Sequence, residues 1–277
     1  MKSNPTPKPF IDFSKKYTVC STLREEFSLT PSPMSVTGGD YRYQHVQGGC
    51  EAKGYLYTCM HTPYTTPNKC CIIKQDFRTG EVVGHSREFE FGHANDATFN
   101  PDENTIVVSF CDHTNQNAIL DADTLSLKEI KVLEGDCLCN IDYDPERQIY
   151  VCVDYQCRFI YVYDKEFRLI KSFEGFMSQG VLREFVMQGV VTDGIYAYVL
   201  EWHGGERWAR ENITESKDVK THFLVFDLKT GKYVDTVDLG IRREIEYAVY
   251  RNGRFYVGCN NIRWNGLELY EVEITAQ

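Results

Sequence analysis

The sequence contains no long hydrophobic run and little positive charge for its length. Among its 277 residues, 30 lysines and arginines stand against 40 aspartates and glutamates, so the formal net charge is −10. Nucleic acids and anionic membranes are bound through basic surfaces, and this charge balance argues against both as partners. No apolar stretch approaches the roughly 18 residues that a membrane-spanning helix needs. We therefore expect a protein that binds neither nucleic acid nor membrane.

The motifs of several common enzyme classes are also absent. The sequence has no Gly-x-Ser-x-Gly nucleophile elbow, no phosphate-binding glycine loop, no His-Glu-x-x-His zinc motif and no dinucleotide-binding fingerprint. No segment shows the periodicity of a long core helix. The chain is long enough to bury a large core, and all-β folds of this size are often single domains. The first expectation is an all-β domain without a familiar catalytic motif.

Signals for export and for metal binding are weak as well. Residues 1–9 are polar and include prolines, without the apolar centre of a signal peptide. The 11 cysteines are an odd number, and we interpret them as free, mostly buried thiols of a cytoplasmic protein, because disulfides are rare in a reducing compartment. Cys70-Cys71 and Cys137-Leu138-Cys139 are close pairs. Neither has a second pair at zinc-site spacing, so the sequence favours no structural metal site there.

One pattern of strand, turn and strand occurs five times along the chain. The clearest copy runs from Asn95 through a turn at 100–104 to an apolar stretch at 106–110. The residue that opens each copy is an amide or an acid: Gln47, Asn95, Asn140, Gln188 and Glu246. These residues lie about 45 to 58 positions apart, close to the roughly 40 to 50 residues of a four-stranded propeller blade.

Each copy continues into an outer pair of strands. In the first four copies an aspartate opens the turn of this pair, and we interpret these residues as turn formers: Asp76, Asp121, Asp164 and Asp227. The fifth copy has only three strands, and a β-branched segment at 17–23 can supply the fourth and leave no exposed edge. The sequence therefore predicts an N-terminal arm at 1–16 and one five-bladed β-propeller domain at 17–277, with four-stranded antiparallel blades and an N-terminal strand closing the last blade.

The residues that open the inner strands are the main candidates for a functional site. In a propeller these strands line the central channel, and side chains two residues earlier point the same way, which adds His45, His93 and Glu244. Histidines, glutamates and amides at one mouth can orient a small polar ligand. The amides can instead satisfy one another and channel water without any ligand. Asp96 is expected to point away from the channel and to bridge blades.

The same side chains are compatible with two kinds of chemistry. Carboxylate and carbonyl oxygens suit calcium or magnesium, whereas two histidines with a carboxylate suit zinc, manganese or iron, so a divalent metal ion is a candidate cofactor. For an enzyme, a metal-assisted hydrolase or lyase is the expected class. His45 and His93 would be metal ligands or the general base, and Glu244 or Glu246 would be the acid, the base or a further ligand.

The ends of the second strands open on the same face and carry aromatic residues beside acids. Glu201, Trp202 and Trp264 are candidate ligand-binding residues, because an aromatic ring covers the apolar face of a sugar while polar neighbours bind its hydroxyls. The tryptophans can equally serve to pack the loops. His61 and Asn260 also lie at ends of second strands.

Three motifs carry a family resemblance. Gln47-Gly48, Gly92-His93-Ala94-Asn95-Asp96 and Gln188-Gly189, each with the turn and strand that follow it, resemble a group of bacterial, largely uncharacterised five-bladed propeller proteins. The sequence is also distantly similar to the helveticin-J-like class of large bacteriocins. The likeness covers roughly residues 40–275. The first group implies the fold but no activity, and the second implies binding to a cell-surface carbohydrate.

These observations predict a propeller that binds a small polar molecule over the central channel, a saccharide being one candidate. The alternative is a non-enzymatic protein-interaction or carbohydrate-binding scaffold. Its contact surface would be the loop at 61–68 and a long polar insertion at 201–220, since long loops in a compact domain are commonly functional. Propellers serve as hydrolases, lyases, lectins and scaffolds alike, so the fold does not decide between these functions.

Overall fold

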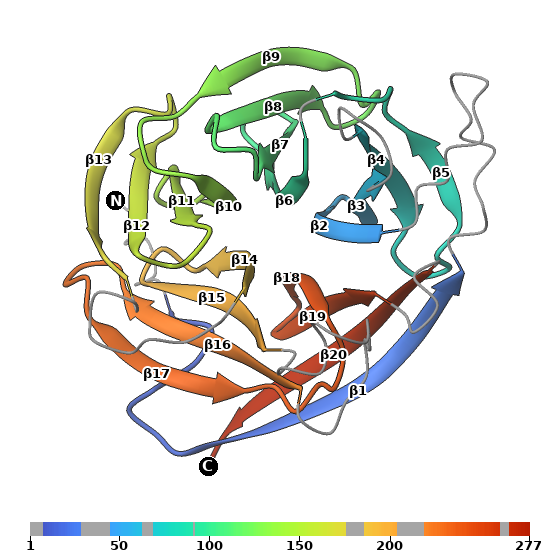
Figure 1. The fold of residues 1–277 in the computed structure, drawn as a ribbon. Coiled ribbons are helices and arrows are strands. Elements are labelled where there is room, and N and C mark those ends of the chain that lie inside the picture. Colours follow the sequence, from blue (N-terminus) through green and yellow to red (C-terminus); the bar gives the residue numbers. More distant parts are fainter. Residues whose placement is uncertain are drawn as a thin grey trace, which may run out of the picture.

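Five four-stranded sheets are arranged as blades around a central channel (Figure 1). The computed structural model describes residues 8–28, 45–62, 69–90, 92–175, 186–203, 219–260 and 266–277. All strand pairs within the blades are antiparallel, so the predicted all-β, five-bladed propeller is confirmed. No helix within these ranges has the length and apolar character needed to cross a membrane.

Four blades follow the same order along the chain, with the innermost strand first and the outermost strand last. The first blade contains β2 (His45–Ala52), β3 (Tyr55–Thr62), β4 (Lys69–Asp76) and β5 (Val82–His85). The second contains β6 (Ala94–Asn100), β7 (Thr105–Phe110), β8 (Gln116–Asp121) and β9 (Leu127–Val132). The third contains β10 (Leu138–Asp144), β11 (Ile149–Asp154), β12 (Phe159–Asp164) and β13 (Leu169–Glu174). The fourth contains β14 (Val186–Thr192), β15 (Tyr196–His203), β16 (Lys220–Asp227) and β17 (Tyr233–Asp238).

The fifth blade joins the two ends of the described chain. From the channel outward it contains β18 (Ile245–Arg251), β19 (Arg254–Asn260), β20 (Gly266–Ala276) and β1 (Tyr17–Ser28). β1 pairs with β20 from Tyr17, opposite Ala276, to Ser28, opposite Gly266. The strand predicted at 17–23 is therefore confirmed as the closing strand. It pairs the backbone of β20, which would otherwise be an exposed edge.

The turns adopt the conformations that their residues favour. The inner hairpin of the fifth blade turns at Asn252 and Gly253, whose φ angles are 52° and 84°. Two consecutive positive φ angles are typical of the type I′ turn, which matches the twist of the flanking strands. In the first outer turn, Asp76 Oδ1 accepts the N–H groups of Arg78 and Thr79 at 2.9 and 2.8 Å. The aspartates of the other three outer turns bond similarly, which confirms them as turn formers.

The hydrophobic core lies between neighbouring blades. Between the fourth and fifth blades, Phe223 and Phe255 are buried with ring centroids 4.8 Å apart. Two residues of the expected N-terminal arm join this core: Ile11 is 3% exposed, and the ring of Phe10 stacks on Tyr250 at a centroid distance of 3.6 Å. Phe10 and Ile11 are therefore packed against the blades that β1 helps to close.

Each inner strand carries a bulge close to its first residue. Pairing with the second strand skips Gln47 and Gly48 in the first blade. In the other blades it skips one residue each: Asn95, Cys139, Gln188 and Glu246. A bulge re-aims side chains and strengthens the local twist. The expected alignment of the repeats is correct in four blades. In the third blade the alignment is displaced by one residue, because the bulge falls on Cys139 and Asn140 pairs with Val153.

Candidate functional site

The bulges lie at one end of the central channel, where inner strands begin and second strands end. This end is termed the channel mouth, and the end formed by the inner hairpin turns is termed the channel base. Polar residues from four blades meet the mouth at such strand ends: His45, His61, His93, Glu201, Glu244, Glu246 and Asn260. Antiparallel blades therefore bring together residues that are far apart in the sequence.

Three buried glutamates of the fourth and fifth blades form the carboxyl side of the mouth. Glu201, on β15, is 0% exposed, and Glu244 and Glu246, at the start of β18, are 6% and 1% exposed. Glu201 Oε2 lies 3.2 Å from His222 Nδ1, and Glu246 Oε1 accepts a hydrogen bond from Asn260 Nδ2. Among the described residues, one oxygen of each glutamate has no hydrogen-bond partner: Oε1 of Glu201 and Oε2 of the other two. Each group therefore keeps one buried oxygen for a partner that these residues do not supply.

Burial keeps part of the carboxyl side protonated at neutral pH. Desolvation raises the pKa of Glu244 to about 8. Burial, followed by repulsion from the Glu244 carboxyl group, raises the pKa of Glu246 well above its usual range, while the hydrogen bond from Asn260 acts in the opposite direction. A protonated carboxyl group donates one hydrogen bond and accepts others. Glu244 and Glu246 thus present proton donors to the mouth rather than negative charges.

Three histidines of the first and second blades form the imidazole side of the mouth. His45 on β2 pairs with His61 on β3, and their ring centroids are 6.2 Å apart. The ring of His61 lies 4.6 Å from that of His93, which precedes β6. The structure therefore links the two predicted histidines through His61. The sequence marks His61 only as a strand end, although its place opposite His45 follows from the register of the two strands.

Burial also keeps the imidazole side uncharged at neutral pH. It lowers the pKa of His45, and it lowers that of His61 to about 3 and that of His93 to about 4, with the neighbouring histidines adding to the effect. Within the described ranges, both ring nitrogens of His61 and Nε2 of His93 are buried without a hydrogen-bond partner. A neutral imidazole has one donor and one acceptor nitrogen. The imidazole side therefore offers proton acceptors to the mouth.

Amide side chains link neighbouring blades at the mouth. Asn260 Oδ1 accepts the N–H of Val46 at 3.0 Å, and its Nδ2 donates to Val46 O at 3.1 Å and to Glu246 Oε1. This residue fastens the carboxyl side to the first blade. Asn95 Nδ2 donates to Asn140 Oδ1 at 2.9 Å, which connects the second and third blades. The other two members of the expected amide ring are also buried: Gln47 and Gln188.

Asp96 and Asp142 connect three blades inside the channel. Asp96 Oδ2 accepts the N–H groups of Ile141 on β10 and Val190 on β14, at 3.1 and 3.2 Å. The prediction that Asp96 bridges blades is confirmed. The prediction that it points away from the channel is wrong, because both partners lie on inner strands of other blades. Asp142 binds Thr98 on β6 and a backbone N–H of β14, and burial raises its pKa to about 7.

A cavity of about 250 Å³ occupies the channel base. The ends of all five inner strands line it, and Phe10 of the N-terminal segment contributes to its wall. Asp142 and Thr98 give the cavity polar groups. It therefore lies at the other end of the channel from the histidines and glutamates of the mouth.

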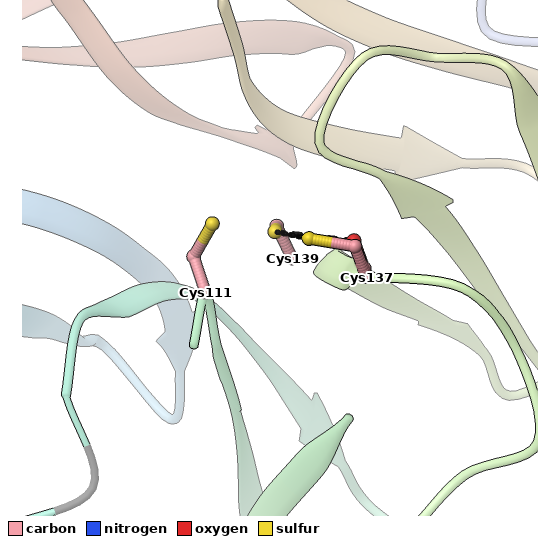
Figure 2. A group of neighbouring side chains, drawn as sticks. All are labelled: Cys111, Cys137 and Cys139. Carbon is pink, nitrogen blue, oxygen red and sulfur yellow. Dashed lines mark hydrogen bonds between the residues drawn. The ribbon is translucent and has the colours of Figure 1, made fainter. Parts of the chain in front are cut away.

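The metal ligands expected at the mouth do not converge. Among the described residues, one group of at least three His, Cys, Asp or Glu side chains has its ligand atoms within 4.8 Å of one another: Cys111, Cys137 and Cys139 (Figure 2). The histidines and glutamates expected to share a divalent ion therefore do not meet as a set of three in this arrangement. Metal binding by these side chains would require them to move closer together.

The predicted aromatic ligand-binding residues do not line the mouth as far as the structure describes them. Trp202 is 2% exposed and belongs to the core between the fourth and fifth blades. Its ring therefore packs the blades together. Trp264 lies outside the described residues, as do positions 63–68 and 204–218 of the two loops expected to form an interaction surface.

No protein-family model matches the sequence, and no curated protein is detectably similar to it. The resemblance to the helveticin-J-like class therefore gains no support. The structure is similar to Myxococcus xanthus glutaminyl cyclase, with a TM-score of 0.58 and 11% identity over 92% of this chain and 97% of that one. It also resembles a DUF4221 family member from Bacteroides vulgatus, with a TM-score of 0.49 and 10% identity over 94% and 99% of the two chains. At 11% identity, the similarity to the glutaminyl cyclase shows a shared fold alone.

Proposed function

We propose that this protein binds a small polar molecule at the channel mouth and acts on it by proton transfer. The observation that carries the proposal is a set of buried polar atoms without partners among the described residues, on Glu201, Glu244, Glu246, His61 and His93. Each such atom destabilises a fold by about 1–3 kcal/mol. Several of them at one end of a channel are expected where a ligand supplies the missing partners.

The protonation states at the mouth favour an uncharged polar ligand. Protonated carboxyl groups and neutral imidazoles both donate and accept hydrogen bonds, so they suit hydroxyl, amide and amine groups. A saccharide remains a candidate on these grounds. Because Trp202 is enclosed in the core, recognition of a sugar would rely on polar contacts with the two sides of the mouth.

The two sides of the mouth supply the two partners of acid–base catalysis. Glu244 is protonated at pH 7 because its pKa is about 8, so it is suited to protonate a leaving group. His61 and His93 are neutral at this pH, and with pKa values of about 3 and 4 they are weak bases, so their role is to accept a hydrogen bond from a substrate group. Hydrolysis and elimination both need a proton donor at the leaving group, and we therefore assign the activity to a hydrolase or a lyase. A metal-assisted form would need the histidines and glutamates to draw together around the ion.

The shared fold with glutaminyl cyclase provides a first substrate to test, namely a peptide with an N-terminal glutaminyl residue. In its cyclisation the α-amino nitrogen would attack the side-chain carboxamide carbon. The amine would give up a proton, and the carboxamide nitrogen would leave as ammonia after gaining one. The protonated Glu244 suits the transfer to the leaving nitrogen, and the neutral imidazoles suit a hydrogen bond from the attacking amine.

A combined binding and turnover screen tests the proposed function. Purified protein is incubated with a glutaminyl peptide, neutral oligosaccharides and acidic oligosaccharides, and products are identified by mass spectrometry. For any compound that reacts, Glu244→Gln is expected to lower turnover by about 100-fold or more, because it removes the proton donor. Glu129→Gln, on the exposed outer strand β9, is the matched control and should leave turnover unchanged. Equal turnover by the Glu244→Gln variant and the wild type would contradict the proposal.

A non-enzymatic scaffold is the competing function. Its contact loops include positions 63–68 and 204–218, which lie outside the described residues. If no compound binds, and if deletion of 204–218 abolishes binding to an identified protein partner while Glu244→Gln does not, the scaffold function replaces the proposed one.

A further inference from the structure

Three cysteine thiols meet where the second and third blades adjoin (Figure 2). Cys111 follows the last residue of β7, whereas Cys137 and Cys139 flank Leu138 at the start of β10. All three sulfur atoms lie within 4.8 Å of one another, and the Cys137 and Cys139 sulfurs are 4.0 Å apart. This boundary lies across the channel from the fifth blade, which carries Glu244 and Glu246 (Figure 1). The thiol cluster is therefore separate from the carboxyl side, and it adjoins the imidazole side through the hydrogen bond between Cys111 and the backbone of His93.

The spacing of the sulfur atoms matches shared coordination of one metal ion. Zinc–sulfur bonds of about 2.3 Å in tetrahedral geometry place two thiolates about 3.8 Å apart. A disulfide requires about 2.05 Å between its sulfurs. The 4.0 Å between Cys137 Sγ and Cys139 Sγ is close to the first distance and about twice the second. A metal would thus need only a small contraction of the cluster.

Hydrogen bonds hold Cys111 and the start of β10 in place. The N–H of Cys111 donates to His93 O at 2.7 Å, and Cys137 O accepts the N–H of Tyr155 at 3.1 Å. Between the two cysteines of the third blade, the N–H of Leu138 donates to Asn115 Oδ1 at 2.8 Å. Cys137 has a φ of 49°, which is unfavourable for a residue with a side chain. Side chains held in this way lose little freedom when they bind an ion.

We propose that Cys111, Cys137 and Cys139 bind one thiophilic d10 metal ion, Zn²⁺ or Cu⁺, through three thiolates. Soft sulfur ligands select these ions over Ca²⁺ and Mg²⁺, which prefer oxygen. Zinc held by three protein ligands keeps a fourth position for another molecule, whereas Cu⁺ is satisfied by few soft ligands. The site does not depend on the acid–base function proposed for the mouth.

Contacts within the cluster shift the pKa values of the three thiols in different directions. Interaction with the neighbouring Cys139 thiol lowers the pKa of Cys111, and the same interaction, followed by burial, raises the pKa of Cys139. Burial raises the pKa of Cys137. Metal binding must therefore displace the remaining thiol protons, so the apparent affinity should rise with pH.

Titration of the reduced full-length protein with Co²⁺, without oxygen, tests the site spectroscopically. Thiolate-to-cobalt charge-transfer absorption should appear, saturate at one equivalent and disappear when Zn²⁺ is added. Cys111→Ser should weaken the affinity for Zn²⁺ by about 100-fold or more, since even the loss of an outer-shell partner costs about 10–100-fold. Cys20→Ser, at an exposed free cysteine on β1, is the matched control and should change nothing.

Alkylation of the wild-type protein keeps the proposal testable if Cys111→Ser does not fold. Iodoacetamide is applied alone, with Zn²⁺ or with Cu⁺, and modified residues are identified by mass spectrometry. Protection of Cys111, Cys137 and Cys139 by either ion, with Cys20 still reactive, supports the site and identifies the ion. Unchanged modification of the three cysteines in the presence of both ions would overturn it, as would charge-transfer absorption that survives in the Cys111→Ser variant.

Discussion

The carboxyl side and the imidazole side of the mouth respond to burial in opposite ways. Glu244 and Glu246 keep their protons because burial penalises the charged carboxylate, whereas His61 and His93 remain unprotonated because burial penalises the charged imidazolium. These four groups are therefore uncharged near pH 7, yet the two glutamates hold protons and the two histidines do not. Desolvation alone, without an ion pair, can separate an acid from a base within one site. The comparison also gives the two sides opposite effects on stability as pH changes.

The largest expected effect comes from Glu244. The unfolded chain loses this proton near pH 4.5 and the folded protein only near pH 8, so rising pH favours the unfolded state throughout this interval. At about 1.4 kcal/mol per pKa unit, the free energy of unfolding should fall by on the order of 5 kcal/mol from this group. Glu244→Gln should reduce this fall in the free energy of unfolding, as measured by urea unfolding at a series of pH values. Glu129→Gln should retain it. A fall that is identical in wild type and Glu244→Gln would show that Glu244 does not titrate in this way.

The opposite effect is expected from His93, and it is smaller. The unfolded chain takes up this proton near pH 6.5 and the folded protein only near pH 4, so stability is lost as pH falls through this interval. The loss should be about 1–3 kcal/mol, below the full value of the shift, because the ring is half-buried. His93→Gln should reduce the acid-side loss, of which His61 supplies a further part, and leave the alkaline-side loss intact. His113→Asn is the control, at an exposed histidine in the same blade. An acid-side loss of the same size in His93→Gln and the wild type would assign it to other groups.

A third prediction concerns the attachment of the carboxyl side to the first blade. Asn260→Ala removes the hydrogen bonds to Val46 and to Glu246 Oε1, and it leaves buried polar groups without partners. The free energy of unfolding should fall by about 1–3 kcal/mol. The pKa of Glu246 should rise further, because the hydrogen bond from Asn260 lowers this pKa in the wild type and the variant lacks that bond. Urea unfolding and carboxyl infrared absorption measure the two effects. A loss of stability below about 0.5 kcal/mol would mean that water molecules replace the hydrogen bonds of Asn260.

The fold could be predicted from the sequence because its signals are local. Turn residues such as Asp76 and Asn252, together with apolar alternation, recur once per blade, and ring closure explains why the fifth copy needs a strand from the N-terminus. Local signals did not predict the exact residue at which the bulge of each inner strand falls. Asn140 has the expected amide, but the bulge in its blade falls on Cys139. The position of a bulge depends on packing between blades, which residue type alone does not encode.

The candidate sites could be predicted only in part, for a related reason. His45 and His93 could be identified from the sequence as strand ends. His61 lies between them because it pairs with His45 within the first blade and its ring lies near that of His93 in the second blade. Spacing rules for zinc sites look for ligand pairs along one stretch of chain. The third thiol, Cys111, comes from the neighbouring blade, so the pair at Cys137 and Cys139 looks incomplete in the sequence.

The smallest expected effect distinguishes a structural group from a functional one at the mouth. Asn95→Ala removes one hydrogen bond, to Asn140 Oδ1, and should lower the free energy of unfolding by about 1 kcal/mol without changing the binding of any ligand found in the screen. Glu244→Gln should weaken ligand binding without lowering stability at pH 5, since its unpartnered oxygen makes no hydrogen bond that stabilises the fold but is available to a ligand. Urea unfolding and calorimetric titration of both variants make this comparison. If Asn95→Ala also abolishes ligand binding, the amides belong to the binding site. If Glu244→Gln destabilises the protein at pH 5 and leaves binding intact, the carboxyl side is structural.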